Sequence, residues 1–306
     1  MQKDVSQESM VSHTSITPVS RKGIILAGGT GSRLAPLTSA ISKQLMPVYD
    51  KPMIFYPLTT LMLSGIRDIL IITKPADKEV FSRLLGSGEA LGMDFSYEVQ
   101  PNAEGIAQAF VIGKKFLGNS HAALILGDNL FHGDELVEQL NEANKQSKSN
   151  LFAYSVRDPE RYGVIEFDQY GQALSIEEKP KQPKSKFAIT GLYFYDNSVS
   201  ERASLIKPSS RGEIEITTLN QMYLKDGLLN VQKLGRGTAW LDTGTFESLQ
   251  DAGSYIRTLE NRQGLKVGCP EEIAWRKGWI NENQLEKLAQ PLISSGYGQY
   301  LLDLIS

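Results

Sequence analysis

Short apolar runs alternate with amphipathic segments along the first half of the chain. Several runs are apolar on both sides, which is typical of buried strands in a largely parallel sheet, and the segments between them have helical periodicity. Pro57 indicates that the first helix begins late or is kinked. The alternation predicts an α/β fold with a doubly wound sheet. Predicted strands are 23–27, 69–72 and 122–126, and predicted helices are 53–64, 79–85, 103–116 and 134–144.

From residue 151 the pattern changes to strands separated by short polar turns. These strands, at 151–156, 164–167, 173–177 and 187–195, would extend the sheet with mixed or antiparallel neighbours. The last forty residues return to helical periodicity, with Pro270 in one first turn and Asn281 as the N-cap of a further helix. We therefore expect a disordered leader at 1–22, a main domain at 23–260 and a helical C-terminal segment at 261–306.

Composition narrows the class of protein. Of the 306 residues, 41% are hydrophobic and 22% are charged, as in ordinary globular proteins, and the formal charge of −3 attracts neither nucleic acid nor anionic membrane. No apolar run is long enough to span a bilayer. The single cysteine, Cys269, excludes an intramolecular disulfide and a cysteine-based zinc cluster. With no secretion signal at the N-terminus, we expect a cytoplasmic protein.

The most informative local feature is a glycine-rich turn, Gly28-Gly29-Thr30-Gly31, directly after the first predicted strand and just before Arg33. Glycines let bare N–H groups approach a phosphate or a base, and the arginine supplies positive charge. The spacing matches neither the dinucleotide fingerprint G-x-G-x-x-G nor the Walker A loop. Taken alone, a plain turn at the edge of a sheet would be the commoner explanation.

The residues after this turn favour a functional role for it over a plain turn. They read Leu34-Ala35-Pro36-Leu37-Thr38, then Lys43-Gln44-Leu45-Met46-Pro47-Val48 and Asp50-Lys51-Pro52, and this order resembles the sugar-1-phosphate nucleotidylyltransferases. It looks closest to the branch that uses dTTP and glucose 1-phosphate. The resemblance extends from residue 23 to the C-terminus through Gln100-Pro101, Leu126-Gly127-Asp128-Asn129, Arg161-Tyr162-Gly163-Val164, Glu177-Glu178-Lys179-Pro180, Thr190-Gly191-Leu192-Tyr193, Arg211-Gly212-Glu213 and Trp240-Leu241-Asp242-Thr243-Gly244.

The resemblance implies a Rossmann-like mixed sheet of the nucleotide-diphospho-sugar transferase type and a Mg²⁺-dependent reaction. The enzyme would transfer dTMP from dTTP to α-D-glucose 1-phosphate, giving dTDP-glucose and pyrophosphate for dTDP-L-rhamnose and related sugars. It also implies a homotetramer that dTDP-L-rhamnose inhibits. A uridylyltransferase that uses UTP is the main alternative, although Gln44 favours the thymidylyl branch. A noncatalytic sugar-nucleotide sensor ranks lower, because the charged residues of the chemistry are present.

Roles carried over from the family fall into four groups. Asp128 and Asp242 would hold Mg²⁺. Taken singly, each aspartate is more typical of a turn. The two residues are 114 positions apart in the sequence, and only the family resemblance predicts that they meet in space. The catalytic cations would be Arg33 and Lys43 at the triphosphate and Lys179 at the sugar phosphate. Nucleotide-binding residues would be Leu26, Ala27, Gly28, Gly29, Thr30, Gly31, Gln44, Gln100 and Gly105, and sugar-phosphate-binding residues would be Tyr162, Gly163, Glu178, Ile189, Thr190 and Arg211.

The C-terminal segment, residues 261–306, has two interpretations. Its apolar positions, among them Ile273 and Leu285, are typical of a helical cap that covers the sheet and supports an oligomer. The family resemblance instead suggests a second nucleotide-sugar site at a subunit interface, with Arg276 as a regulatory phosphate contact.

Overall fold

The computed structural model describes residues 20–306, so the predicted disordered leader lies outside the described residues except at its end. The first strand, β1, spans Arg21–Ala27 and begins two residues before the predicted start. It lies in the middle of a nine-stranded mixed sheet with the order β10-β9-β11-β6-β1-β4-β5, in which β8 pairs with β11 and β12 with β8.

The strands of this sheet divide into a parallel half and a mixed half. Neighbours β5, β4, β1 and β6 run parallel, whereas β11 is antiparallel to β6, β8 and β9. The predicted change to mixed strands is therefore confirmed. The strands are β4 (Asp68–Thr73), β5 (Asp94–Val99), β6 (His121–Leu126), β8 (Ser149–Ser155), β9 (Gly163–Phe167), β10 (Ala173–Glu178), β11 (Phe187–Tyr195) and β12 (Leu229–Lys233).

Two short sheets lie outside the main one. Strands β2 (Pro47–Val48) and β3 (Lys51–Pro52) form a small hairpin. Strands β7 (Asn129–His132) and β13 (Ala239–Asp242) pair antiparallel, and they join parts of the chain that are far apart in sequence.

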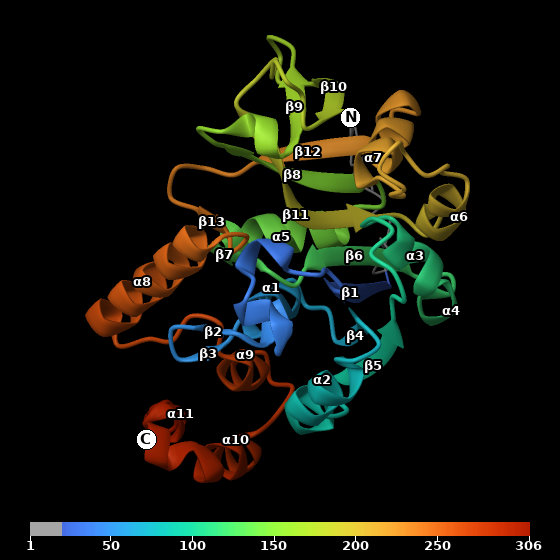
Figure 1. Ribbon diagram of the computed structural model, residues 1–306. Coiled ribbons are helices and arrows are strands. Elements are labelled where there is room, and N and C mark those ends of the chain that lie inside the picture. Colours follow the sequence, from blue (N-terminus) through green and yellow to red (C-terminus); the bar gives the residue numbers. More distant parts are fainter. Residues whose placement is uncertain (1–19) are drawn as a thin grey trace, which may run out of the picture.

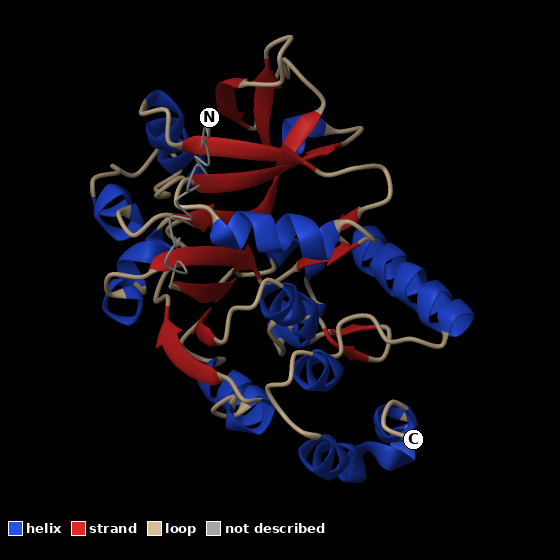
Figure 2. Cartoon of the chain, turned by 180° about the vertical axis from the view of Figure 1, so that it is seen from behind, coloured by secondary structure: helices blue, strands red, loops and turns tan. Residues whose placement is uncertain are grey.

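Helices cover both faces of the main sheet (Figure 1), as the doubly wound prediction requires. Alternate residues of β1 point to opposite faces: Ile25 packs in the core with α1, α2 and α5, and Ile24 packs in the core with α3, α6 and α7. Figure 2 shows helices lying across the rear face. The helices of the main body are α1 (Phe55–Leu63), α2 (Lys78–Leu85), α3 (Gln108–Ile112), α4 (Lys114–Leu117), α5 (Leu136–Lys145), α6 (Val199–Ser204), α7 (Ile216–Lys225) and α8 (Phe246–Gln263).

Helix α1 begins late, as Pro57 indicated. The first i to i−4 bond of the helix runs from Leu58 N–H to Ile54 C=O at 3.1 Å, so Pro57 lies in the first turn, where no intrahelical donor is needed. The predicted helix 103–116 is wrong at its start and is broken in the middle. The backbone of Glu104 and Ala107 pairs instead with Ile214, and α4 follows α3 only after Gly113.

The C-terminal helices follow the predicted signals. Helix α9 (Pro270–Arg276) has Pro270 in its first turn, and α10 (Glu282–Ala289) has Asn281 as an N-cap in a capping box with Gln284. Helix α11 (Tyr297–Asp303) completes the segment. Helix α8 was not predicted, and the predicted junction at residues 260–261 lies inside it. Among residues 20–306, no helix combines the length and apolarity needed to cross a membrane.

Candidate active site

Two adjoining cavities open where the parallel strands end. The larger has a volume of about 530 Å³ and the smaller about 250 Å³, and both are lined by Arg33 and Asp128. The order β6-β1-β4-β5 places them at the topological switch point, where the loops after β1 and β6 diverge and where open α/β sheets bind ligands. The larger cavity contains the predicted residues Leu26, Tyr162, Gly163, Glu178, Lys179, Ile189, Arg211 and Asp242, and the smaller contains Gly29, Thr30, Gly31, Lys43 and Gln44.

The glycine-rich turn lies directly against Gln100, which follows β5. A Cβ on Gly28 would lie 2.3 Å from Gln100 Oε1, so only glycine leaves room for this amide. The amide of Gln100 is 3% exposed and is oriented by two bonds from Nε2, to Gly105 C=O at 3.2 Å and to Gln108 Oε1 at 2.6 Å. Gly28, Gln100 and Gly105, all predicted to bind the nucleotide, therefore form one contact group.

Gly28→Ala should weaken dTTP binding by about tenfold, because the new methyl group displaces a contact worth roughly 1–1.5 kcal/mol. Stability should change little, since the displaced atoms end a flexible side chain. The measurement is the KM for each substrate together with the melting temperature. Gln100→Ala provides the control: if Gly28→Ala acts through Gln100, the double variant should be no worse than Gln100→Ala, whereas additive losses would contradict this explanation.

Lys43 and Asp128 form a close ion pair in the wall of the smaller cavity. Lys43 is 5% exposed, and its Nζ lies 2.5 Å from Asp128 Oδ2. Burial alone would raise the pKa of Asp128, but the Lys43 ammonium and a hydrogen bond from the Asn129 amide outweigh it and lower the pKa. Asp128 is therefore an anion at neutral pH.

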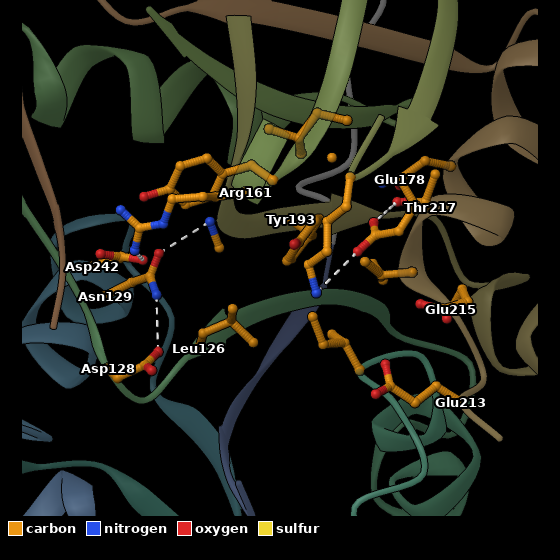
Figure 3. Close-up of a pocket in the computed structure, with 18 of the residues that line it drawn as sticks. Leu126, Asp128, Asn129, Arg161, Glu178, Tyr193, Glu213, Glu215, Thr217 and Asp242 are labelled. Atoms are coloured by element: carbon orange, nitrogen blue, oxygen red, sulfur yellow. Dashed lines mark hydrogen bonds and ion pairs between the residues drawn. The ribbon is translucent and has the colours of Figure 1, made fainter. Parts of the chain in front are cut away.

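The pairing of β7 with β13 brings Asp242 to Asp128. Asp242 stands opposite Asn129 in the register, and the Thr243 N–H donates to Asp128 C=O at 3.2 Å. Figure 3 shows both carboxylates at the same end of the cavity. The sequence could not show this proximity.

The two carboxylates fit a magnesium ion. Mg²⁺ commonly takes one or two protein carboxylates and completes its octahedron with phosphate oxygens and water. No cluster of three or more His, Cys, Asp or Glu side chains suited to a metal occurs among residues 20–306, so a cage made only of protein ligands is absent from that part of the chain. Two carboxylates beside the cavity of the glycine-rich turn are a ligand set of the kind that suits Mg²⁺.

Arg33 and Arg161 bring positive charge to the cavity that these carboxylates line. Within residues 20–306, Arg33 has no carboxylate at ion-pair distance, and its guanidinium packs over Gly244, where a Cβ would lie 3.0 Å from Nη2. Arg161 lies 3.6 Å from Asp242 and 2.6 Å from Asp158. Arg161 was given no role from the sequence, although it stands inside the motif that predicted Tyr162.

Glu178 and Lys179 follow one another at the far end of the larger cavity. Glu178 stands opposite Gly163 in the β9–β10 pair and accepts a hydrogen bond from Thr217 Oγ1 at 2.5 Å. Lys179 has a φ of +43°, in the left-handed region that favours glycine, and its N–H donates to Tyr162 C=O at 3.0 Å. A strained backbone at a cavity wall is typical of a functional position. Thr217 was missed because only the fold brings α7 here.

Four other predicted site residues are paired with a carboxylate, buried or outside the two cavities. Arg211 lines the larger cavity, but its guanidinium bonds to Glu215 at 2.8 Å. Thr190 is fully buried and lines neither cavity, because neighbouring residues of β11 point to opposite faces and Ile189 faces the cavity. Ala27 is likewise fully buried, under the glycine turn. Arg276 lies outside both cavities and bonds to Glu272 at 2.7 Å.

The sequence model of the nucleotidyl transferase family matches residues 22–258. The chain belongs to this family. It is 57% identical over 285 residues to a glucose-1-phosphate thymidylyltransferase of Neisseria meningitidis, with 93% of this chain and 99% of the relative covered. A glucose-1-phosphate thymidylyltransferase of Mycolicibacterium smegmatis is 58% identical over 284 residues, with the same coverage.

Solved structures of nucleotidyltransferases share the fold. A crystal structure assigned as a glucose-1-phosphate thymidylyltransferase of Bacillus anthracis, in complex with sucrose, has a TM-score of 0.72 and 43% identity over 78% of this chain and 96% of that one. A UDP-glucose pyrophosphorylase complexed with UDP-glucose has a TM-score of 0.68 and 25% identity over 78% of this chain and 99% of that one. The predicted family and fold class are therefore confirmed.

Proposed function

We propose that the protein is a Mg²⁺-dependent enzyme that transfers dTMP from dTTP to α-D-glucose 1-phosphate, releasing pyrophosphate and forming dTDP-glucose. One observation carries the proposal. Asp128 and Arg33 belong to both cavities, so a triphosphate held at the glycine turn and a sugar phosphate in the larger cavity would meet at one charged junction. Relatives 57–58% identical over nearly their whole length carry the name of this activity.

The reaction requires positioning and charge neutralisation more than covalent help. An oxygen of the sugar phosphate attacks the α-phosphorus while pyrophosphate leaves on the opposite side, and the attacking group is already an anion, so no general base is needed. Arg33 and Lys43 stabilise the negative charge on the triphosphate, and Lys179 holds the attacking phosphate. Asp128 and Asp242 would hold Mg²⁺, which when bound neutralises phosphate charge.

Base selection is assigned to Gln100 and Gln44. The Gln100 Oε1 faces the glycine turn while Nε2 is held by Gly105 and Gln108, which leaves an acceptor for the N3–H of a pyrimidine. Thymine and uracil differ by one methyl group, which an apolar contact discriminates by only about 1–3 kcal/mol. We therefore expect measurable use of UTP beside a preference for dTTP. The uridylyltransferase alternative is less supported, since the UDP-glucose pyrophosphorylase neighbour is 25% identical.

Pyrophosphate release from dTTP tests the proposal directly. Release should require glucose 1-phosphate and Mg²⁺ together and should yield dTDP-glucose in equal amount. Binding of both substrates without pyrophosphate release would instead favour the noncatalytic sensor. Faster release from UTP than from dTTP would favour the uridylyltransferase.

Lys179→Gly should raise the KM for glucose 1-phosphate by about 10–100-fold, because a charge-assisted contact contributes roughly 1.5–3 kcal/mol. The KM for dTTP should stay within about twofold. Glycine suits the positive φ of this position, so Lys179→Gly should melt no lower than Lys179→Ala while sharing its kinetic defect. Steady-state kinetics and thermal unfolding of both variants provide the check. A rise confined to the KM for dTTP would mean that the phosphate roles are reversed.

The regulatory role of Arg276 also belongs to this proposal. The site would lie on α9, which packs against α1 and lines neither cavity, so an inhibitor such as dTDP-L-rhamnose would bind there in addition to the substrates. Coupling between two such sites is typically about 1–3 kcal/mol and must be reciprocal. The homotetramer and the cytoplasmic location stay predictions from the sequence.

Arg276→Ala should weaken the binding of dTDP-L-rhamnose to enzyme saturated with dTTP and should spare turnover. Isothermal titration of both proteins is the measurement. Strictly competitive binding, with no second event in the unaltered protein, would leave α9 with a structural role only.

A further inference from the structure

Asn129 follows Asp128 in the sequence and is only 3% exposed. Both polar atoms of its side chain have hydrogen-bond partners within the protein. Its Nδ2 donates to Asp128 Oδ1 at 2.9 Å. Its Oδ1 accepts two hydrogen bonds, from Trp240 Nε1 at 2.6 Å and from the Gly191 backbone N–H at 3.2 Å. Figure 3 shows Asn129 between the two aspartates at one end of the cavity.

These bonds fix the direction of the amide. Indole and backbone N–H groups can only donate, so the carbonyl end of Asn129 must face Trp240 and Gly191, and the amino end must face Asp128. The other carboxylate oxygen of Asp128, Oδ2, faces Lys43. Both oxygens of Asp128 thus have assigned donors, which sets the plane of the carboxylate.

Glycine at position 191 is part of the same arrangement. A Cβ there would lie 2.5 Å from Asn129 Oδ1 and 2.7 Å from its Cγ, so any larger residue would push the amide away. Trp240 packs against Tyr162, with ring centres 5.2 Å apart, and against Tyr154, with ring centres 5.9 Å apart. This aromatic packing fixes the ring whose N–H donates to Asn129.

We propose that Asn129 is a positioning residue, oriented by the Trp240 indole and the Gly191 backbone, that holds the Asp128 carboxylate in the orientation needed to bind a divalent cation. This rests on the proposed role of Asp128 as a metal ligand. Partners that orient a ligating carboxylate typically contribute about 10–100-fold to metal affinity. Asn129, which lines the larger cavity, would thereby influence the affinity for the metal through its hydrogen bond to Asp128.

Trp240→Phe tests this with little change in packing, because phenylalanine keeps an aromatic ring next to Tyr162 and Tyr154 and removes the donor. The probe is Mn²⁺, titrated in the presence of dTTP and without a sugar phosphate and followed by electron paramagnetic resonance, so no reaction takes place. We expect the Kd for Mn²⁺ to rise by about tenfold. Tyr154→Phe is the matched control: its hydroxyl donates to Thr238 C=O and touches neither aspartate, so Mn²⁺ affinity should not change.

Gly191→Ala is the second variant, in case Trp240→Phe does not fold, and it should weaken Mn²⁺ binding with Trp240 intact. The proposal is overturned if both variants fold and bind Mn²⁺ as the unaltered protein does while Asp128→Asn does not, a result that leaves the proposed function standing. Normal Mn²⁺ binding by Asp128→Asn would overturn the metal assignment and this inference together.

Discussion

Asp242→Asn should lower turnover on the order of 10²–10³-fold at saturating substrates, because the change removes an anionic ligand from a metal that stabilises phosphate charge by several kcal/mol. The amide is nearly the same size as the carboxylate. The native contact it loses is a partly exposed pair with Arg161 at 3.6 Å, so the free energy of unfolding should change by less than about 1 kcal/mol. Turnover and thermal unfolding of the same preparation are the two measurements.

Asp158→Asn is the matched control for this variant. Asp158 is the other carboxylate that pairs with Arg161, at 2.6 Å, but it lines neither cavity. Each variant removes one carboxylate partner of Arg161, and Asp158→Asn removes the nearer one. Only Asp242→Asn removes a proposed metal ligand. Equal losses in both would mean that Arg161, and not the metal, accounts for the effect.

Arg33→Ala should slow turnover to a similar extent, on the order of 10²–10³-fold, since removing one preorganised donor at developing charge typically costs that much. Arg33 lines both cavities, and no carboxylate among residues 20–306 neutralises it. Its full charge is therefore available to a phosphate bound in either cavity. Because no native ion pair is lost, stability should stay within about 0.5 kcal/mol of the unaltered protein.

Two further variants separate charge from geometry at Arg33. Arg33→Lys keeps the charge but loses the planar fork, so it should recover only part of the activity. Arg83→Ala removes an exposed arginine of α2, remote from both cavities, and should be neutral. A normal rate of pyrophosphate release by Arg33→Ala would show that the phosphates are held elsewhere.

Most of the fold could be predicted from local pattern, and the error in the helix 103–116 has a clear physical cause. The strand 122–126 and the helix from 134 to 144 were predictable because their apolar residues face one or both cores. The helix 103–116 looked continuous because its composition is helical, but the backbone near Gly105 pairs with Ile214, more than a hundred residues away. Local propensity carries no information about such a partner.

The candidate site likewise contains residues that local sequence could predict and residues that it could not. The glycine turn, Asp128 and Lys179 could be placed because each stands in a contiguous motif at the end of a strand. The approach of Asp242 to Asp128 depends on the β7–β13 pairing, and the roles of Thr217 and Asn129 depend on contacts between separate elements. These residues have no distinctive local sequence signal apart from the motif around Asn129, so only the structure reveals what they touch.

The most direct test of the account is the position of the metal. Crystals of the protein with Mn²⁺ and dTTP, in the absence of sugar phosphate, would locate the ion by its anomalous scattering. We expect one peak coordinated by a carboxylate oxygen of Asp128, a carboxylate oxygen of Asp242 and oxygens of the triphosphate, with the thymine beside Gln100. A metal bound to the triphosphate but contacting neither aspartate would contradict the account.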